Sequence, residues 1–442
     1  MIGKNQELIY ALSYRGNVNL AGKAFKGSNT SSLGLIAIKP DGSGHEWAVE
    51  VAGVSEPNNP DGIRVTSMQM DNNGALYVFG TFAKSITLGN ATYTPPQGSF
   101  LTRHGFVAKL NAQRQWESVK ILNISEIPSV NDIYIETFAL ARASTGEIYL
   151  SGIFKGKLTL SPLSPLGPLS IESSTRQLFV IQLGSDLSEK SATQSTDAPD
   201  ISRVNLAIDS ADRLYLSTSF TDSIKLGGQL LSGSTSGETV RAIAHLDFNN
   251  ASLPWRWSSL VPTGDDDERG ILAAPNGGLL VSATLRDAFQ LGSTNLPKPP
   301  HPTALLASFD PQGQVRWTQT FTSNNQSGGS LLYAATNGNP LWVITHVDAG
   351  QIDGRSALPP QLGESLAASI FSFDPLGKAL TVSTLTTVQS IRTGFEGSPL
   401  AMQIKEKSLF LAGGLRQGTS IYGQSYNVTG IEDPFAYRLF FQ

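Results

Sequence analysis

Few residues in this 442-residue chain are suited to chemistry. It has no cysteine, which excludes thiolate metal sites, a cysteine nucleophile and a disulfide scaffold. A metal site built on histidine needs several donors that converge on one point. The histidines occupy different positions of the repeat described below, so the sequence favours isolated side chains over a metal site. They are His45, His104, His245, His301 and His346.

The densest acidic feature is the run Asp265, Asp266, Asp267 and Glu268. Ca²⁺ prefers clustered carboxylate and carbonyl oxygens, so this run is the candidate for a metal site. Its spacing does not match an EF-hand loop, and consecutive carboxylates cannot all point at one ion. We therefore expect a solvated, self-repelling turn and no cofactor, with Ca²⁺ as the alternative.

No catalytic motif stands out. The segment Gly233–Gly237 places Thr235 where a nucleophile elbow needs serine, and no strand–helix pattern follows it. Glycoside hydrolysis needs two facing carboxylates, and the sequence cannot select a pair among 36 acidic residues. We predict that the chain is not an enzyme, and we assign no catalytic or cofactor-binding residue.

Composition also limits the partners. The formal net charge of −4 argues against a dedicated nucleic-acid binder. No window approaches the roughly 18 uninterrupted apolar residues of a membrane span, so no membrane insertion is expected. The sequence from Met1 to Gly16 lacks the apolar core and cleavage site of a signal peptide. An extracellular, cell-surface or particle-associated location is favoured, and the compartment itself is left open.

The elements that would position any site repeat about seven times, with a period near ~65 residues. One phrase has a turn residue, a short apolar and aromatic run, and then a small or hydroxylated residue. We expect that small residue at a crowded site between neighbouring sheets. The copies are GNVNLAGKAF (Gly16–Phe25), GALYVFGTF (Gly74–Phe82), GEIYLSGIF (Gly146–Phe154), DRLYLSTSF (Asp212–Phe220), GGLLVSATL (Gly277–Leu285), NPLWVITHV (Asn339–Val347) and KSLFLAGGL (Lys407–Leu415).

A second phrase follows each first one and alternates apolar and polar residues, as a half-buried strand does. Asp310–Gly313 and Asp374–Gly377 then place Asp, Pro and Gly as a type I turn prefers them. A tryptophan often opens the strand after this turn. We expect these indoles to pack on a sheet edge rather than to stack on a sugar. They are Trp47, Trp116, Trp255 or Trp257, and Trp317.

Each repeat thus predicts four antiparallel strands and a hairpin arm. The strands of the second repeat are expected at Ile63–Asp71, Leu76–Phe82, Gly105–Asn111 and Gln115–Leu122. A Leu-Gly motif between its second and third strands, Ser85–Gly89, predicts the arm. Matching arms are expected at Ser223–Gly227, Ala288–Gly292 and Gly350–Gly354, with variable, proline-rich tips.

A four-stranded sheet of this size cannot bury both faces alone, whereas stacking sheets around an axis buries both. We predict an all-β, seven-bladed β-propeller of four-stranded antiparallel blades, forming a single domain over residues 1–442. The last repeat ends with its third strand, so either the last blade is incomplete or the strand boundaries are out of phase with the blades. The approximate repeats are 7–54, 61–123, 132–195, 202–261, 267–323, 329–390 and 398–442.

The segment Gly74–Trp116 resembles the bacterial SBBP β-propeller repeat in its ALYVFGTF, ITLG, HGFVAKLN and RQW motifs. The resemblance covers all seven repeats, loosely in the third, sixth and seventh. Where the family pattern often has Asp before the Phe-Val strand, this chain has His104-Gly105. SBBP repeats occur in bacterial secreted, surface and multidomain proteins as modules without assigned chemistry. The resemblance implies the fold more strongly than a function, and it carries over no catalytic residue.

Variable tips on a stiff repeated frame suit an interaction surface, because loops can change without unfolding the frame. The sequence therefore predicts a non-catalytic β-propeller scaffold for protein–protein or cell-surface recognition, as a subunit of a bacterial or phage surface or tail-like assembly. The alternative is a carbohydrate-binding lectin or adhesin, or a glycan-acting hydrolase. The expected partner is a protein or a cell-surface glycan, and the oligomeric state is left open.

Overall fold

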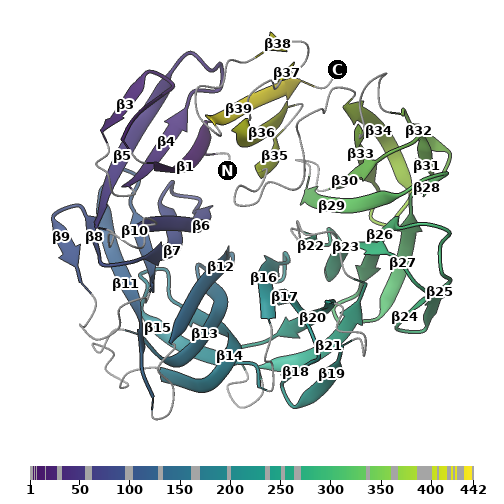
Figure 1. Cartoon of the computed structure of the whole chain (residues 1–442), viewed down its shortest axis with the longest axis horizontal. Coiled ribbons are helices and arrows are strands. Elements are labelled where there is room, and N and C mark those ends of the chain that lie inside the picture. Colours follow the sequence, from purple (N-terminus) through teal and green to yellow (C-terminus); the bar gives the residue numbers. More distant parts are fainter. Residues whose placement is uncertain are drawn as a thin grey trace. The chain divides into compact units, whose positions relative to one another are not determined.

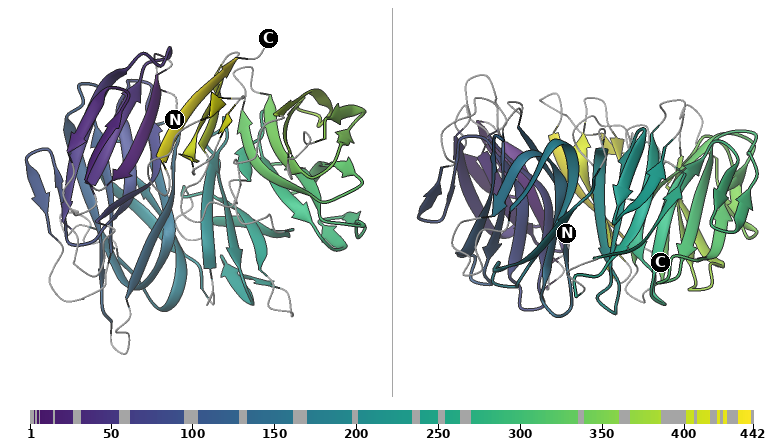
Figure 2. Two further views of the ribbon diagram at one scale, coloured as in Figure 1. Left: turned by 45° about the horizontal axis from the view of Figure 1, so that its top comes forward. Right: turned by 90° about the horizontal axis from the view of Figure 1, so that it is seen from below.

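The computed structural model divides the chain into two compact units. Unit 1 comprises Met1–Leu206, Thr218–Glu238 and Asp247–Arg256, and unit 2 comprises Ala207–Ser217, Thr239–Leu246 and Trp257–Gln442. The structure describes residues 3, 5, 7–14, 16–26, 32–54, 62–94, 103–127, 133–160, 170–196, 201–233, 239–249, 254–262, 270–334, 339–359, 367–385, 401–405, 408–415, 420–421, 424–425 and 433–440. Every regular element in these ranges is a β-strand (Figures 1 and 2).

Unit 1 has two large antiparallel sheets. One has the order β1-β4-β5-β8-β9, and the other has the order β15-β14-β13-β11-β10-β7-β6, with β12 also paired to β13. Hairpins β2-β3 and β18-β19 complete this unit. Its strands are β1 (Leu8–Tyr14), β2 (Asn17–Leu20), β3 (Lys23–Lys26), β4 (Ser32–Ile38), β5 (His45–Val54), β6 (Ile63–Met70), β7 (Leu76–Phe82), β8 (Ser85–Leu88), β9 (Ala91–Tyr93), β10 (His104–Leu110), β11 (Trp116–Ser125), β12 (Tyr134–Arg142), β13 (Ile148–Leu160), β14 (Ser170–Leu183), β15 (Glu189–Gln194), β18 (Ser223–Leu226) and β19 (Gln229–Ser232).

Unit 2 contains the sheets β22-β23-β26-β27, β29-β30-β33-β34, β28-β31-β32 and β35-β36-β39, and the hairpins β24-β25 and β37-β38. Three strands contribute residues to both units: β16 (Ile201–Ile208), β17 (Leu214–Phe220) and β21 (Trp255–Val261). The others are β20 (Val240–Leu246), β22 (Ile271–Ala273), β23 (Leu279–Leu285), β24 (Phe289–Leu291), β25 (Thr294–Leu296), β26 (Thr303–Phe309), β27 (Val315–Thr320), β28 (Thr322–Ser323), β29 (Ser327–Ala334), β30 (Pro340–His346), β31 (Gly350–Ile352), β32 (Arg355–Ala357), β33 (Ala367–Phe373), β34 (Ala379–Leu385), β35 (Ala401–Lys405), β36 (Ser408–Leu415), β37 (Ser420–Ile421), β38 (Gln424–Ser425) and β39 (Asp433–Phe440).

The continuous apolar runs of the first phrase form strands that are buried on both faces. All seven residues of β7 and of β23 are buried, which explains why these runs do not alternate with polar residues. One hydrophobic core of unit 1 lies between the strands of the second repeat and those of the third, where Phe79 and Val107 pack in one cluster with Leu150 and Phe179. This packing places the strands around the cavity described below.

The sequence-based strands of the second repeat are confirmed as β6, β7, β10 and β11. The first copy of the phrase, however, was wrongly interpreted. Gly16–Phe25 does not form the second strand of a blade; its residues fold into the β2–β3 hairpin, and β1 pairs with β4 as β7 pairs with β10. The hairpin turns at Ala21 and Gly22, whose φ angles of 49° and 76° are those that a tight two-residue turn requires.

The small residue of the phrase is crowded from within its own sheet, which corrects the expected site between neighbouring sheets. A Cβ on Gly80 would lie 2.0 Å from the carbonyl oxygen of Arg64, and one on Gly152 would lie 2.1 Å from that of Glu136. The pairing register shifts at both places, between Val65 and Ser67 on β6 and between Thr137 and Ala139 on β12. Glycine therefore makes room for a bulge in the facing first strand.

The hairpin arms form as expected, and they also tie successive repeats together. In Figure 1, β8 of the second repeat lies beside β5 of the first, where Gly53 pairs with Ile86. Strand β13 of the third repeat pairs with β11, Thr196 pairs with Lys225, and β31 pairs with β28. The arms thus have a structural role in addition to carrying variable tips.

The packing expected for tryptophan is confirmed in unit 2. The indole Nε1 of Trp257 donates to the carbonyl of Pro311 at 2.8 Å, and that of Trp317 donates to the carbonyl of Pro375 at 3.4 Å. Each indole covers a turn glycine of the following repeat, Gly313 or Gly377, so closely that a Cβ there would collide with the ring. The tryptophan of one repeat therefore rests on the turn of the next.

The all-β fold of antiparallel sheets is confirmed. The described strands of the last repeat form the three-stranded sheet β35-β36-β39. The seven-blade arrangement, its closure and the single-domain organisation are not tested and stay predictions. The described residues form no helix that could span a membrane.

Candidate functional site

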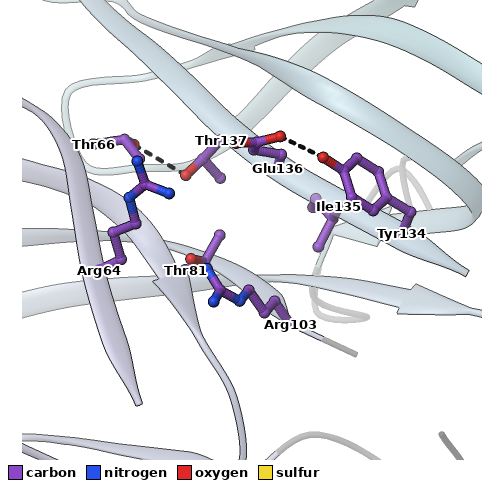
Figure 3. Close-up of a pocket in the computed structure, with 8 residues that line it drawn as sticks. All are labelled: Arg64, Thr66, Thr81, Arg103, Tyr134, Ile135, Glu136 and Thr137. Atoms are coloured by element: carbon purple, nitrogen blue, oxygen red, sulfur yellow. Dashed lines mark hydrogen bonds between the residues drawn. The ribbon is translucent and has the colours of Figure 1, made fainter. Parts of the chain in front are cut away.

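Unit 1 contains a cavity of about 220 Å³ beside β6 and β12 (Figure 3). Strand β12 packs against both β6 and β7, so the cavity lies where the second repeat meets the third. Its lining combines two guanidinium groups, three threonines and one carboxylate. The lining residues are Arg64, Thr66, Thr81, Arg103, Tyr134, Ile135, Glu136 and Thr137.

The two bulges explain which residues of these strands reach the cavity. On β6 they are the alternate residues Arg64 and Thr66, and on β12 they are the consecutive residues Tyr134–Thr137. A regular strand sends successive side chains to opposite faces, whereas a bulge re-aims the side chains beside it. On β6 the bulge falls at Thr66, two residues after the exposed Arg64. On β12 it directly follows Thr137. Arg103 enters from the residue before β10.

Two threonine hydroxyls connect the facing strands. Thr66 Oγ1 donates to the carbonyl of Phe79 at 3.2 Å, and it lies 3.0 Å from Oγ1 of Thr137. Because the Thr66 proton is directed at Phe79, the Thr137 hydroxyl is the donor between the two. Both protons are thus used inside the protein, and the threonines fix the wall of the cavity.

Tyr134 holds the carboxylate of the cavity. Its hydroxyl donates to Glu136 Oε2, and Figure 3 shows the two groups turned toward each other. The guanidinium carbon of Arg176 lies 4.7 Å from the centre of the Tyr134 ring. Burial, the hydrogen bond to Glu136 and its negative charge raise the pKa of Tyr134, against smaller effects of Arg176 and Arg103. The phenol therefore stays protonated at neutral pH and acts as a donor.

The charge of the site is positive. Two arginines line the cavity and a third stacks behind Tyr134, against the single carboxylate of Glu136. Arg64 has no hydrogen-bond or ion-pair partner among the described residues. Guanidinium groups bind planar carboxylates and phosphates through paired N–H donors, so the arrangement is suited to an anion.

None of the histidines that the sequence analysis considered lines this cavity. His104 follows Arg103 but is buried, and burial lowers its pKa to about 4, so it is neutral at pH 7. The others have separate neighbours: His45 Nδ1 lies 3.0 Å from the carbonyl oxygen of Ala21, and His346 lies between Asp348 and Ser369. His245 stacks on Tyr215, and His301 lies in the loop between β25 and β26.

The described residues contain no group of three or more His, Cys, Asp or Glu arranged for a metal ion. The acidic run Asp265, Asp266, Asp267 and Glu268 lies outside the described residues, as does Thr235. The residues of the cavity were not found from the sequence. The available signal was the Tyr134-x-Glu136 spacing, which places two polar side chains on one face of a strand.

No protein-family model matches the chain, and no curated protein matches its sequence. Solved structures do match it. A quinohemoprotein alcohol dehydrogenase from Comamonas testosteroni has 9% identity and a TM-score of 0.41, over 92% of this chain and 72% of that one. A virginiamycin B lyase from Staphylococcus aureus has 9% identity and a TM-score of 0.34, over 82% and 95%. A glucose dehydrogenase has 12% identity and a TM-score of 0.34, over 82% and 96%.

These matches correct the predicted function. The similar structures are propeller-like enzymes, so the prediction of a non-catalytic recognition scaffold, made because variable tips on a repeated frame suit an interaction surface, is wrong. At these identities the likeness concerns the fold alone and does not show that this chain is catalytic or holds a cofactor. The expected location and the macromolecular partner stay predictions.

Proposed function

We propose that this chain is a seven-bladed β-propeller of SBBP-like repeats whose unit 1 binds a small organic anion in the cavity of Arg64 and Arg103. The repeated elements support the architecture. Arms pair with the preceding repeat, and tryptophans rest on the turn of the following repeat. Both contacts recur between consecutive repeats, as stacked blades require.

The observation that carries the binding proposal is the guanidinium group of Arg64, which has no partner among the described residues although it lines a cavity. An arginine without a partner beside a second guanidinium and a fixed polar wall attracts carboxylates and phosphates. The cavity of about 220 Å³ is smaller than the roughly 300–1,000 Å³ of sites for drug-sized molecules, so the ligand is small.

Binding is the chemistry that these side chains support. The threonine hydroxyls are engaged with Phe79 and with each other, and Tyr134 remains protonated. An activated nucleophile needs a neighbouring base or a lowered pKa, and none of the described lining residues meets that requirement. The lining groups hold and orient an anion.

Calorimetric titration of the purified full chain with succinate tests this proposal. We expect saturable binding, and we expect Arg64→Gln to weaken it about tenfold or more, because a charge-assisted pair of hydrogen bonds is lost. Arg355→Gln is the matched control, since Arg355 is an exposed arginine on strand β32. Absence of binding by the wild type, or equal weakening by both variants, contradicts the proposal.

A further inference from the structure

The cavity of unit 1 holds two opposite charges that do not form an ion pair with each other. Arg64 and Glu136 line the same cavity, and neither is paired with the other among the described residues. A guanidinium and a carboxylate attract strongly at short range when water is partly excluded. Their separation inside so small a space therefore needs a physical cause.

Tyr134 supplies that cause. Its hydroxyl donates to Glu136 Oε2, while its ring is held by the Arg176 guanidinium. The carboxylate of Glu136 is thereby anchored, and the other oxygen, Oε1, has no partner among the described residues. The cavity thus presents an unpaired cation, Arg64, and an unpaired acceptor, Glu136 Oε1.

We propose that the ligand is an amino acid whose carboxylate binds Arg64 and whose ammonium group binds Glu136. This inference rests on the anion binding proposed above and names the ligand class. A plain carboxylate would leave Glu136 Oε1 without a donor and would bring like charges together. An ammonium group supplies three donors and a positive charge at that place.

The guanidinium group of Arg103 narrows the class of amino acid that fits the cavity. Arg103 also lines the cavity and carries a guanidinium charge. A ligand with a second carboxylate gains from that charge, so acidic amino acids such as aspartate match the lining best. Aspartate has only about nine heavy atoms, which suits a cavity below the usual range for drug-sized ligands.

Aspartate and succinate form a matched pair of probes, because they share a four-carbon dicarboxylate skeleton and differ only by the ammonium group. The net charge of aspartate is smaller than that of succinate, so the positive cavity alone favours succinate. A preference for aspartate therefore reports the contact with Glu136.

Calorimetric titrations of the full chain at neutral pH test the inference. We expect L-aspartate to bind about tenfold or more tightly than succinate, as a charged hydrogen bond implies. Glu136→Gln should reverse the preference and tighten succinate, since a negative charge is removed. Tyr134→Phe, which keeps the ring but removes the hydroxyl, should reduce the preference. Malate distinguishes a hydroxyl from an ammonium donor, and we expect it to bind more weakly than aspartate.

The outcomes separate this inference from the proposed function. Equal binding of aspartate and succinate, or an aspartate preference that survives Glu136→Gln, overturns the inference and leaves anion binding standing. Malate binding as tightly as aspartate overturns the ammonium contact. If no probe binds the wild type, both proposals fail. Succinate binding and far-ultraviolet circular dichroism show that each variant is folded.

Discussion

Unit 1 and unit 2 differ in how they accommodate an arginine where two repeats meet. In unit 1, Arg64 is exposed at the cavity where β6 meets β12. In unit 2, Arg241 of β20 is 0% exposed; its Nε donates to Ser217 Oγ at 3.1 Å and its Nη1 to the Ser282 carbonyl at 2.7 Å. Trp342 of β30, also 0% exposed, donates to Ser282 Oγ at 2.8 Å.

The difference shows how to separate a structural charge from a binding charge. Burying a charge costs several kcal/mol of lost hydration. Hydrogen bonds from neighbouring polar groups must offset that cost if the charge is to stay buried. Arg241 is compatible with the core because serine and backbone oxygens accept its protons. Arg64 remains in contact with water and has no such acceptors among the described residues. The same residue type therefore packs inside the core in one unit and lies exposed at a cavity in the other.

The largest expected loss of stability follows from removing the Trp342 side chain, which donates to Ser282 in unit 2. Trp342→Ala should lower the free energy of unfolding by about 3–5 kcal/mol, because it creates a cavity and leaves the Ser282 hydroxyl without its donor. Denaturant unfolding followed by circular dichroism measures this loss. A loss below about 1 kcal/mol would show that the contact in unit 2 is no tighter than that in unit 1.

The next effect concerns a carboxylate that joins two repeats within unit 2. The side chain of Asp209 is fully buried, and it accepts hydrogen bonds from the backbone of Ala211 and Arg213, from Tyr215 and Arg213 side chains, and from Gly278 of the next repeat. Burial raises the pKa of Asp209, but these hydrogen bonds outweigh it and lower the pKa overall. The carboxylate is therefore stabilised in its charged form by folding.

Asp209→Asn should lower the free energy of unfolding by about 2 kcal/mol at pH 7, because an amide group replaces an acceptor. A lowered pKa contributes stability above the unfolded value of about 3.9 that is lost as the pH falls through the folded value. The wild type should lose this contribution on acidification, and the variant should lose less. Asp71→Asn is the control, since the described residues that donate to Asp71 Oδ1, Asn73 and Ala75, both belong to its own turn. Equal pH profiles for wild type and Asp209→Asn would contradict the assignment.

The sequence predicted the repeated strands because their apolar runs and turns recur in each copy. The strands β7 and β10 and the arm at Ser85 were found in this way. The first copy failed because the arm of the first repeat, Gly16–Phe25, happens to contain the same glycine and aromatic residues as the phrase. A local pattern cannot distinguish two elements of similar composition when the pairing partner decides between them.

The repeat pattern could not predict the cavity. Arg64 and Tyr134 lie on first strands, which share no recurring phrase, and their strands meet although they are far apart in the sequence. The bulges that re-aim their neighbours follow from glycines on the facing strands, Gly80 and Gly152. The sequence showed these glycines as small residues, but only the strand pairing shows which backbone they accommodate.

The smallest loss of stability is expected at the Thr66–Thr137 hydrogen bond beside the cavity of unit 1. Thr137→Val removes a buried hydroxyl that is hydrogen-bonded to Thr66 and keeps nearly the same side-chain volume. Thr66 still donates to the carbonyl of Phe79, so no backbone acceptor loses its partner. The free energy of unfolding should therefore fall by about 1 kcal/mol or less, in the same denaturant experiment as Trp342→Ala. A loss as large as that of Trp342→Ala would mean that β6 and β12 are joined as firmly as the strands of unit 2, and the contrast between the two arginines would then need another explanation.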